Sequence, residues 1–145
     1  MLSRLKNIFK RSAPALYTEE ELRAVEQHIE MHCGAYKTVM HEIVSPDIHV
    51  DIFPISPTPE RNYYTLVTCG MGARKMNIPD DCKELARAEL AIVLPPDWKL
   101  NEKSEKWYWP IRLLTTLARY PINADTWVGW GHTLVPFWHR VFLES

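Results

Sequence analysis

The sequence predicts an α+β fold with a central, mostly antiparallel sheet flanked by helices. The expected elements run helix, four strands, helix, strand, an order that lacks the strand–helix–strand repeat of a parallel sheet. The 145 residues are 46% hydrophobic and 24% charged, close to the averages of globular domains. A chain of this length suits one domain. We therefore expect a single domain over residues 18–145, preceded by a basic arm over residues 1–17.

The first helix is expected to begin at Thr18, because Thr18 and Glu21 have the spacing of a capping box. Gly34 supplies the stop signal. Between them, apolar side chains recur every three or four residues, at Leu22, Val25, Ile29 and Cys33. We expect this stripe to face the core.

Two paired strands are expected next, over residues 36–44 and 48–55, because the turn signal Ser45-Pro46-Asp47 separates them. Side chains of the second segment alternate between a buried face with Ile48, Val50 and Ile52 and an opposite face with His49, Asp51 and Phe53.

A third strand over residues 63–70 is rich in β-branched and aromatic residues and runs into Gly70-Met71-Gly72. The glycines allow a positive φ or the close approach of another backbone, so a special loop is expected there. Residues 88–94 form two apolar faces before Pro95 and Pro96 stop the run, which is typical of a central strand.

A second helix is expected to have Pro110 in its first turn and to end before Pro121. After it, residues 125–135 are aromatic and β-branched but include Gly129 and Gly131. This combination favours an irregular strand with a bulge.

Charge and cysteine usage exclude several classes of function. A net charge of −1 gives no long-range attraction to nucleic acid or anionic lipid. No run of ~18 apolar residues occurs, so no stable membrane insertion is expected, and residues 1–11 lack the apolar core of a signal peptide. The three cysteines form no C-x-x-C pair, as is typical of a reducing compartment. We expect a cytoplasmic protein that binds no nucleic acid.

The first helix carries one pair of histidines with a spacing that metal sites use. His28 and His32 lie four residues apart beside Cys33 and could share a metal ion. The pair lacks the Glu of a metalloprotease helix, and histidines commonly flank an apolar stripe without binding metal. We therefore expect no metal.

Two His–carboxylate pairs, His49 with Asp51 and His132 with Asp125, could act as an acid and a base. No nucleophile motif accompanies either pair, and Cys69 falls in a hydrophobic strand pattern where an inert thiol is the common case. Gly70-Met71-Gly72 also lacks the further residues of a nucleotide-binding loop. We expect neither an enzyme nor a cofactor.

Aromatic residues crowd the C-terminal half, which holds Trp98, Trp107, Trp109, Trp127, Trp130 and Trp138. A single Trp is more often part of the core than of an interface. Among six, at least one exposed anchor for a partner is expected.

Several segments, taken in order, resemble the suppressor of fused family. They are H-V-D-I-F-P at residues 49–54, Y-Y-T-L-V-T-C-G-M-G at 63–72, A-E-L-A-I-V-L-P at 88–95, W-P-I-R-L-L-T-T-L-A-R-Y-P at 109–121 and D-T-W-V-G-W-G-H-T at 125–133. The order and spacing of the segments carry more weight than any one of them, and the resemblance covers roughly residues 18–133.

The resemblance implies an α+β fold without intrinsic enzymatic activity and a function in protein binding. Eukaryotic relatives restrain a zinc-finger transcription factor by clamping an extended peptide. Bacterial relatives are frequently immunity proteins that neutralise a cognate polymorphic toxin. By this analogy we expect an immunity protein. The alternatives are a regulatory scaffold that sequesters another bacterial protein, or a small His/Asp hydrolase.

A partner surface implied by the resemblance would have aromatic anchors surrounded by polar groups. The expected anchors are Tyr64, Trp127 and Trp130, with Glu89, Asp125 and His132 around them. Two of the polar residues could instead have no role in binding. Glu89 could simply be solvated, and Asp125 could cap a turn.

Two features depart from the family pattern. Gly72 stands where relatives usually carry Ser, so a ligand hydrogen bond from that serine cannot be transferred. The chain also ends at Ser145, soon after Gly131-His132-Thr133, whereas family domains generally continue. Either the domain is naturally shortened at its C-terminus or the sequence is truncated. If late strands of the sheet are missing, the exposed sheet edge would permit self-association.

Overall fold

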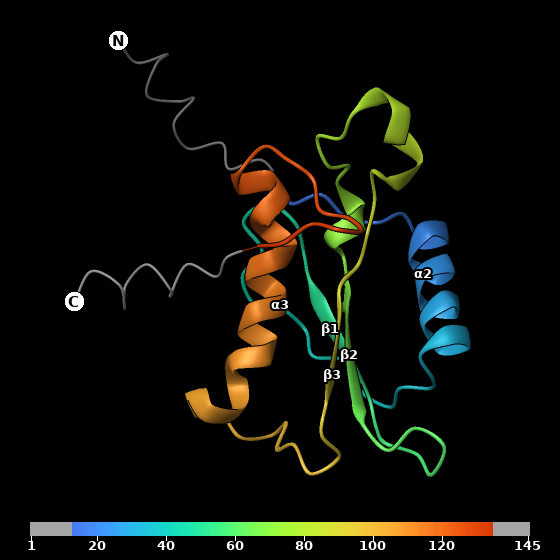
Figure 1. The fold of residues 1–145 in the computed structure, drawn as a ribbon, viewed down its shortest axis with the longest axis vertical. Coiled ribbons are helices and arrows are strands. Elements are labelled where there is room, and N and C mark those ends of the chain that lie inside the picture. Colours follow the sequence, from blue (N-terminus) through green and yellow to red (C-terminus); the bar gives the residue numbers. More distant parts are fainter. Residues whose placement is uncertain (1–12, 135–145) are drawn as a thin grey trace, which may run out of the picture.

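Residues 13–134 are described by the computed structural model, so residues 1–12 of the predicted arm and residues 135–145 lie outside the described part. A three-stranded antiparallel sheet lies between two helices (Figure 1). The elements are α2 (Glu19–His32), β1 (Asp51–Ile55), β2 (Tyr64–Cys69), the 3-10 helices η1 (Met71–Ala73) and η2 (Asp80–Leu85), β3 (Ala91–Leu94) and α3 (Glu105–Asn123). The predicted α+β class is confirmed.

Helix α2 begins where the capping box predicts. The Thr18 hydroxyl accepts from the Glu21 backbone N–H at 3.2 Å, and the Glu21 carboxylate accepts from the Thr18 N–H at 2.9 Å. The helix packs on one face of the sheet through a buried cluster of Ile29, Phe53, Ile55, Val67 and Cys69.

The opposite face of the sheet packs against α3, through Ile52, Leu66, Leu94, Ile111 and Leu114. Successive strand side chains point to opposite faces, so a sheet covered on both faces needs apolar residues at every position. Ile52, Phe53, Pro54 and Ile55 are accordingly all buried. Phe53 faces the side opposite to Ile52, as expected, and that side is buried as well, because α2 covers it.

A third apolar cluster closes the end of the sheet at which β2 finishes. It consists of Ile48, Val50, Met71, Met76 and Ala118. Part of α3 and the segment around η1 are thereby joined to the start of β1.

Helix α3 is longer than predicted and contains both prolines. It begins after Ser104 and runs through Pro110 and Pro121, which are buried. A proline removes one backbone N–H, but the last turn of a helix mainly needs partners for its carbonyls. The Thr126 N–H donates to the Pro121 carbonyl at 3.0 Å, which satisfies one of them.

The strand predicted over residues 36–44 is wrong. It is reduced to one antiparallel bridge, in which the Met40 and Ile52 backbones exchange hydrogen bonds of 2.9 and 3.0 Å. The chain leaves this ladder after Met40, since the Glu42 N–H donates to the Asp51 carboxylate at 3.0 Å instead of to a carbonyl. The sequence after the bridge then runs exposed through Ile43 and Val44.

Two further strand predictions need correction. In the described part β3 is an edge strand, with Ala91 and Val93 exposed, so the expectation of a central strand is wrong. The irregular strand predicted at 125–135 is a loop over residues 125–134, and Val135 lies outside the described residues. Positive φ angles at Asp125 and Gly131 turn the chain instead of extending it.

Candidate protein-binding site

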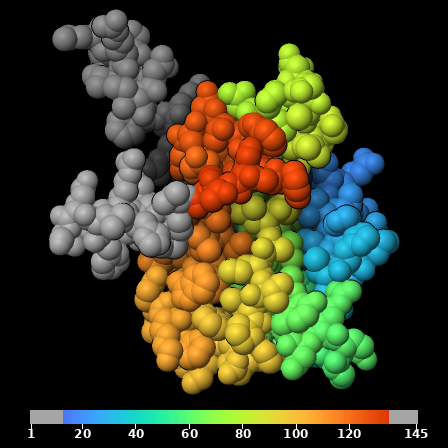
Figure 2. Space-filling view, viewed as in Figure 1, coloured from blue at the N-terminus to red at the C-terminus, as the bar shows by residue number. Residues whose placement is uncertain are grey.

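The loop that follows α3, residues 124–134 and here called the post-helix loop, carries four of the six predicted site residues. It lies at the surface beside the segment around η2 (Figure 2). The Asn77 amide donates to the main-chain oxygen of Asp125 at 3.3 Å and to its carboxylate at 3.2 Å. Nearby, the Val128 N–H points to the Met76 sulfur at 3.4 Å. These contacts fix the loop on the body of the domain.

Trp127 and His132 stabilise the loop from within. The half-buried Trp127 packs on the cluster that contains Met71 and Met76. The His132 ring lies edge-on to the Trp127 ring, with centroids 4.2 Å apart, and its Nδ1 accepts from the Gly129 N–H at 3.2 Å. The stretch from Trp127 to His132 therefore folds back on itself as a compact turn.

Trp130 lies in that turn, and 99% of its surface is exposed to solvent. An exposed indole on an anchored loop is an energetically unfavourable surface in water, and tryptophan is the residue type most enriched at interface hot spots. Asp125 and His132 are exposed on the same loop. The post-helix loop thus brings Asp125, Trp127, Trp130 and His132 together.

Tyr64 lies apart from these residues, at the opposite end of β2. It lines a hollow of about 430 Å³ together with Met40 and Trp98. A second hollow of about 520 Å³ shares Met40 and Leu100 with the first and extends to Tyr108 on α3. The two hollows form a groove between residues 37–43 and the segment before α3.

Glu89 is engaged inside the protein. Its carboxylate accepts from the Tyr17 hydroxyl at 2.5 Å and from the Thr68 hydroxyl at 2.6 Å. The same carboxylate accepts from three successive backbone N–H groups, those of Gly70, Met71 and Gly72, at 2.9, 3.3 and 3.0 Å. These five hydrogen bonds within the protein explain the presence of Glu89 without any binding partner. The alternative that Glu89 is simply solvated is therefore wrong.

Gly70 and Gly72 are both required to be glycine, because other parts of the chain lie too close to leave room for a Cβ atom. Gly70 has a φ of +130°, and a Cβ there would collide with the main-chain oxygen of His49. A Cβ at Gly72 would collide with the Tyr17 hydroxyl. A Ser at position 72 would therefore not fit this arrangement without displacing Tyr17.

Burial and the charge of Glu89 perturb two neighbouring groups. Burial first, and Glu89 second, raise the pKa of the Tyr17 phenol well above its ordinary value. The same two causes raise the pKa of the Cys69 thiol to about 12. Cys69 is thus a neutral thiol at neutral pH, as expected for an inert buried cysteine.

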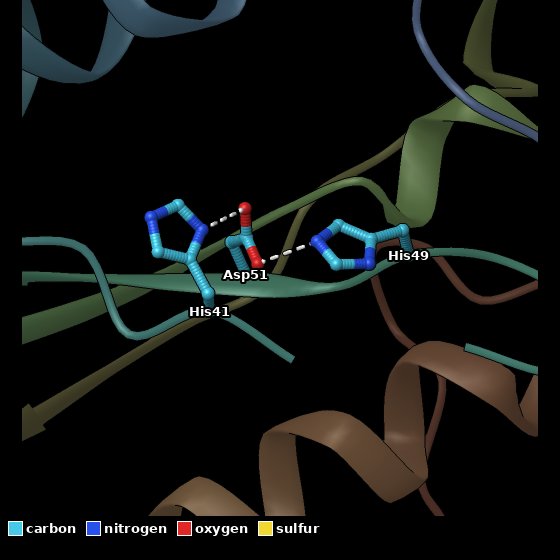
Figure 3. A group of neighbouring side chains, drawn as sticks. All are labelled: His41, His49 and Asp51. Carbon is cyan, nitrogen blue, oxygen red and sulfur yellow. Dashed lines mark hydrogen bonds and ion pairs between the residues drawn. The ribbon is translucent and has the colours of Figure 1, made fainter. Parts of the chain in front are cut away.

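A separate polar cluster forms where β1 begins (Figure 3). Asp51 lies between two histidines, with His41 Nδ1 3.1 Å from Oδ2 and His49 Nε2 2.9 Å from Oδ1. The alternation of His49 and Asp51 along one strand predicts their shared face, but His41 lies ten residues away and depends on the Met40–Ile52 bridge.

Neither sequence-predicted acid–base pair has the contacts of a hydrolase. The Ser45 hydroxyl donates to the Glu42 carboxylate at 3.1 Å and lies 2.5 Å from His49 Nδ1. The hydroxyl has one proton, so while it donates to Glu42 the bond to His49 Nδ1 needs the imidazole as donor, which is opposite to the transfer that activates a serine. At the second pair, Asp125 bonds Asn77, whereas His132 accepts from Gly129.

The two histidines of α2 that were considered as metal ligands are close in space, with the His28 and His32 ring centroids 4.3 Å apart. Among the described residues, the group of metal-ligating side chains that comes together is instead His41, His49 and Asp51. Within residues 13–134, neither α2 nor α3 has the length and apolarity needed to cross a membrane.

The fold and its sites define an α+β domain with an aromatic surface loop and an internal carboxylate hub. The model of the suppressor of fused protein (SUFU) family matches residues 46–142. The chain therefore belongs to the suppressor of fused family, and the resemblance drawn from its motifs is confirmed. Family membership suggests a protein-binding role, because the family is one of regulatory binding proteins.

A bacterial relative is known by sequence. An uncharacterized protein of Ureaplasma parvum serovar 3 is 27% identical over 123 residues, which cover 82% of this chain and 58% of the relative. The chain thus spans little more than half the length of that relative. No solved structure matches the chain.

Proposed function

We propose that the chain is a non-enzymatic binding domain that docks a partner protein on its post-helix loop, with Trp130 as the central anchor. The observation that carries this proposal is the fully exposed indole of Trp130 on a loop held by Asn77, Met76 and Trp127. A preorganised aromatic side chain loses little conformational freedom on binding, so most of its burial contributes to affinity.

Polar groups around the anchor supply the selectivity. Asp125 and His132 lie on the same exposed loop, and rim charges of this kind mainly affect the rate of encounter and the choice of partner. Trp127 has a positioning role, because its ring packs on the core and on His132. Glu89 contributes only indirectly, by fixing the turn at residues 70–72.

The favoured partner is a cognate bacterial toxin, which makes the chain an immunity protein. Membership of the suppressor of fused family and the existence of a bacterial relative support this role. The protein would act by covering the toxin, which requires affinity and no chemistry of its own. The alternative is a regulatory scaffold that sequesters a different bacterial protein.

Capture from a native cell lysate, followed by mass spectrometry, identifies the partner. The expected result is a protein with a C-terminal toxin domain in roughly equal amount. Expression of that partner alone should arrest growth, and co-expression of this chain should restore it. A captured partner that leaves growth unaffected would favour the scaffold, whereas a folded preparation that captures nothing would contradict the binding function.

A second surface is supported by the groove that contains Tyr64, since its combined hollows could accept an extended segment of a partner. Substitution of Tyr64 by Ala separates the two surfaces. If the partner docks on the post-helix loop, Tyr64→Ala binds normally, whereas an extended segment held in the groove would lose affinity.

A further inference from the structure

We propose that His41, His49 and Asp51 form a binding site for a divalent transition-metal ion of the Zn²⁺ class. Backbone pairing brings the three together. The Met40–Ile52 bridge sets His41 opposite Asp51, and His49 precedes Asp51 by two residues on the same face of the chain. The two imidazole rings then approach the carboxylate from opposite sides (Figure 3).

The hydrogen bonds around His49 define which of its nitrogens carries a proton. Glu42 Oε2 accepts from the Val50 N–H at 2.8 Å, and Glu42 Oε1 pairs with Arg119 at 2.6 Å, so this carboxylate is ionised and only accepts. Ser45 therefore donates its hydroxyl proton to Glu42. His49 Nδ1 must in turn donate to the Ser45 oxygen.

This assignment leaves His49 Nε2 as the nitrogen that faces Asp51. In the neutral imidazole Nε2 is an acceptor, and it lies 2.9 Å from the carboxylate oxygen Oδ1, which is also an acceptor. Two acceptors this close repel each other unless a positive charge lies between them. A proton on Nε2 would supply that charge by making His49 a cation, and a metal ion supplies it while His49 stays neutral, which is the form in which histidine binds metals.

The remaining contacts match the surroundings of a metal ligand. A ligating histidine usually donates its other ring N–H to a protein oxygen, which Ser45 provides for His49. The Glu42 N–H also holds Asp51 Oδ1 at 3.0 Å. The ligand atoms lie within 4.8 Å of one another, and tetrahedral ligands with bonds of about 2.0–2.1 Å lie about 3.3 Å apart. Binding would therefore need a rotation of the exposed His41 ring toward His49 and Asp51.

The donor set indicates the class of ion. Two imidazoles and one carboxylate suit Zn²⁺, Co²⁺ or Fe²⁺, whereas Mg²⁺ and Ca²⁺ prefer oxygen ligands. The nearby Arg119 does not oppose a cation, because Glu42 and Asp47 both pair with it. The bound ion would add to the Met40–Ile52 bridge and to the hydrogen bonds of Glu42 and Ser45, which already join this segment to the start of β1.

Titration of the chelator-treated full chain with Zn²⁺ by calorimetry, and with Co²⁺ by visible absorption, tests the site. We expect one ion per chain and a higher melting temperature with Zn²⁺. His41→Ala and Asp51→Asn should each weaken binding by at least about tenfold. His41 is the safer substitution for folding, because 73% of its side chain is exposed. His28→Ala is the matched control, since it removes an exposed histidine from the pair on α2.

Loss of binding in His41→Ala and Asp51→Asn, with His28→Ala unchanged, supports the site. The proposal is overturned if the folded wild-type chain shows no saturable uptake of either ion, or if His41→Ala binds as tightly as the wild type. It is equally overturned if only His28→Ala loses the ion, because the ion would then belong to α2.

Discussion

The carboxylate of Glu89 lies 2.5 Å from the hydroxyl of Tyr17, although 72 residues separate the two in the sequence. This contact joins the segment before α2 to the segment before β3. Since the same carboxylate also holds the backbone turn after β2, one side chain fixes three parts of the chain. Glu89 is accordingly a determinant of stability.

Replacement of Glu89 by Gln should lower the free energy of unfolding by about 2–4 kcal/mol, because an amide cannot accept from all five donors and brings two donors of its own. Urea unfolding followed by circular dichroism measures the change. Glu84→Gln is the matched control, as Glu84 is exposed on η2. Equal stability of the two variants would contradict the role assigned to Glu89.

Gly72 and Tyr17 should behave as a coupled pair. Gly72→Ala places a methyl group against the Tyr17 hydroxyl, and Tyr17→Phe removes that hydroxyl. The double variant should therefore be more stable than the sum of the two single losses predicts, by about 0.5–3 kcal/mol in a double-mutant cycle. No such rescue is expected for Gly70→Ala, whose Cβ meets the His49 backbone. Strict additivity at Gly72 would show that the hydroxyl is not the obstacle.

Alkaline pH should destabilise the fold through Cys69 and Tyr17. The folded state raises the pKa of both groups, so the unfolded chain loses its protons first. For Cys69 the contribution is complete below its ordinary pKa of 9.0 and is lost as pH rises toward about 12. Urea midpoints measured from pH 8 to 11 should fall, and Cys69→Ala should flatten the slope. An unchanged slope would contradict the thiol's contribution.

Arg119 joins α3 to the chain before β1. Its guanidinium contacts Glu42 at 2.6 Å and Asp47 at 2.9 Å and donates to the Ile48 carbonyl at 3.0 Å. Arg119→Lys keeps the charge but cannot reproduce the fork of donors, so we expect a loss of about 2–4 kcal/mol in unfolding free energy. Arg112→Lys, at an exposed pair with Glu105, should change stability by less than about 1 kcal/mol. Similar losses in the two variants would refute the difference between these pairs.

Local signals in the sequence predict local structure well here. The start of α2 is predicted by Thr18 and Glu21 because a capping box acts within one helical turn. The strand character of β2 is likewise predicted, because the segment is rich in β-branched and aromatic residues, which suit a strand that is covered on both faces. These elements need little information from distant parts of the chain.

The wrong strand predictions fall where contacts with distant residues determine the backbone conformation. Residues 36–44 have the composition of a strand, but the Asp51 carboxylate takes the Glu42 N–H and ends the pairing. The post-helix loop has the aromatic composition of a strand. It forms a turn instead, because Trp127 packs on the core and His132 bonds back to the Gly129 N–H. The single-domain extent of residues 18–145 stays a prediction.

Part of the candidate site could likewise be predicted from the sequence, where the signal is local. The abundance of tryptophan predicts aromatic anchors, and the structure brings Trp127 and Trp130 into one loop while leaving Tyr64 at the other end of β2. The hub at Glu89 and the contribution of His41 could not be predicted, because each depends on a backbone turn or bridge formed by distant residues.

The central claim is that a partner protein docks on Trp130, and one binding measurement tests it most directly. The partner captured from cells is titrated against the wild type, Trp130→Ala and Ile43→Ala. Ile43 is the control for exposed apolar surface elsewhere, because it is 98% exposed against 99% for Trp130 and lies in the groove, outside the post-helix loop. We predict that Trp130→Ala weakens binding by about 2 kcal/mol or more, roughly thirtyfold, while Ile43→Ala binds as the wild type does. Equal affinity of Trp130→Ala and wild type would contradict the claim.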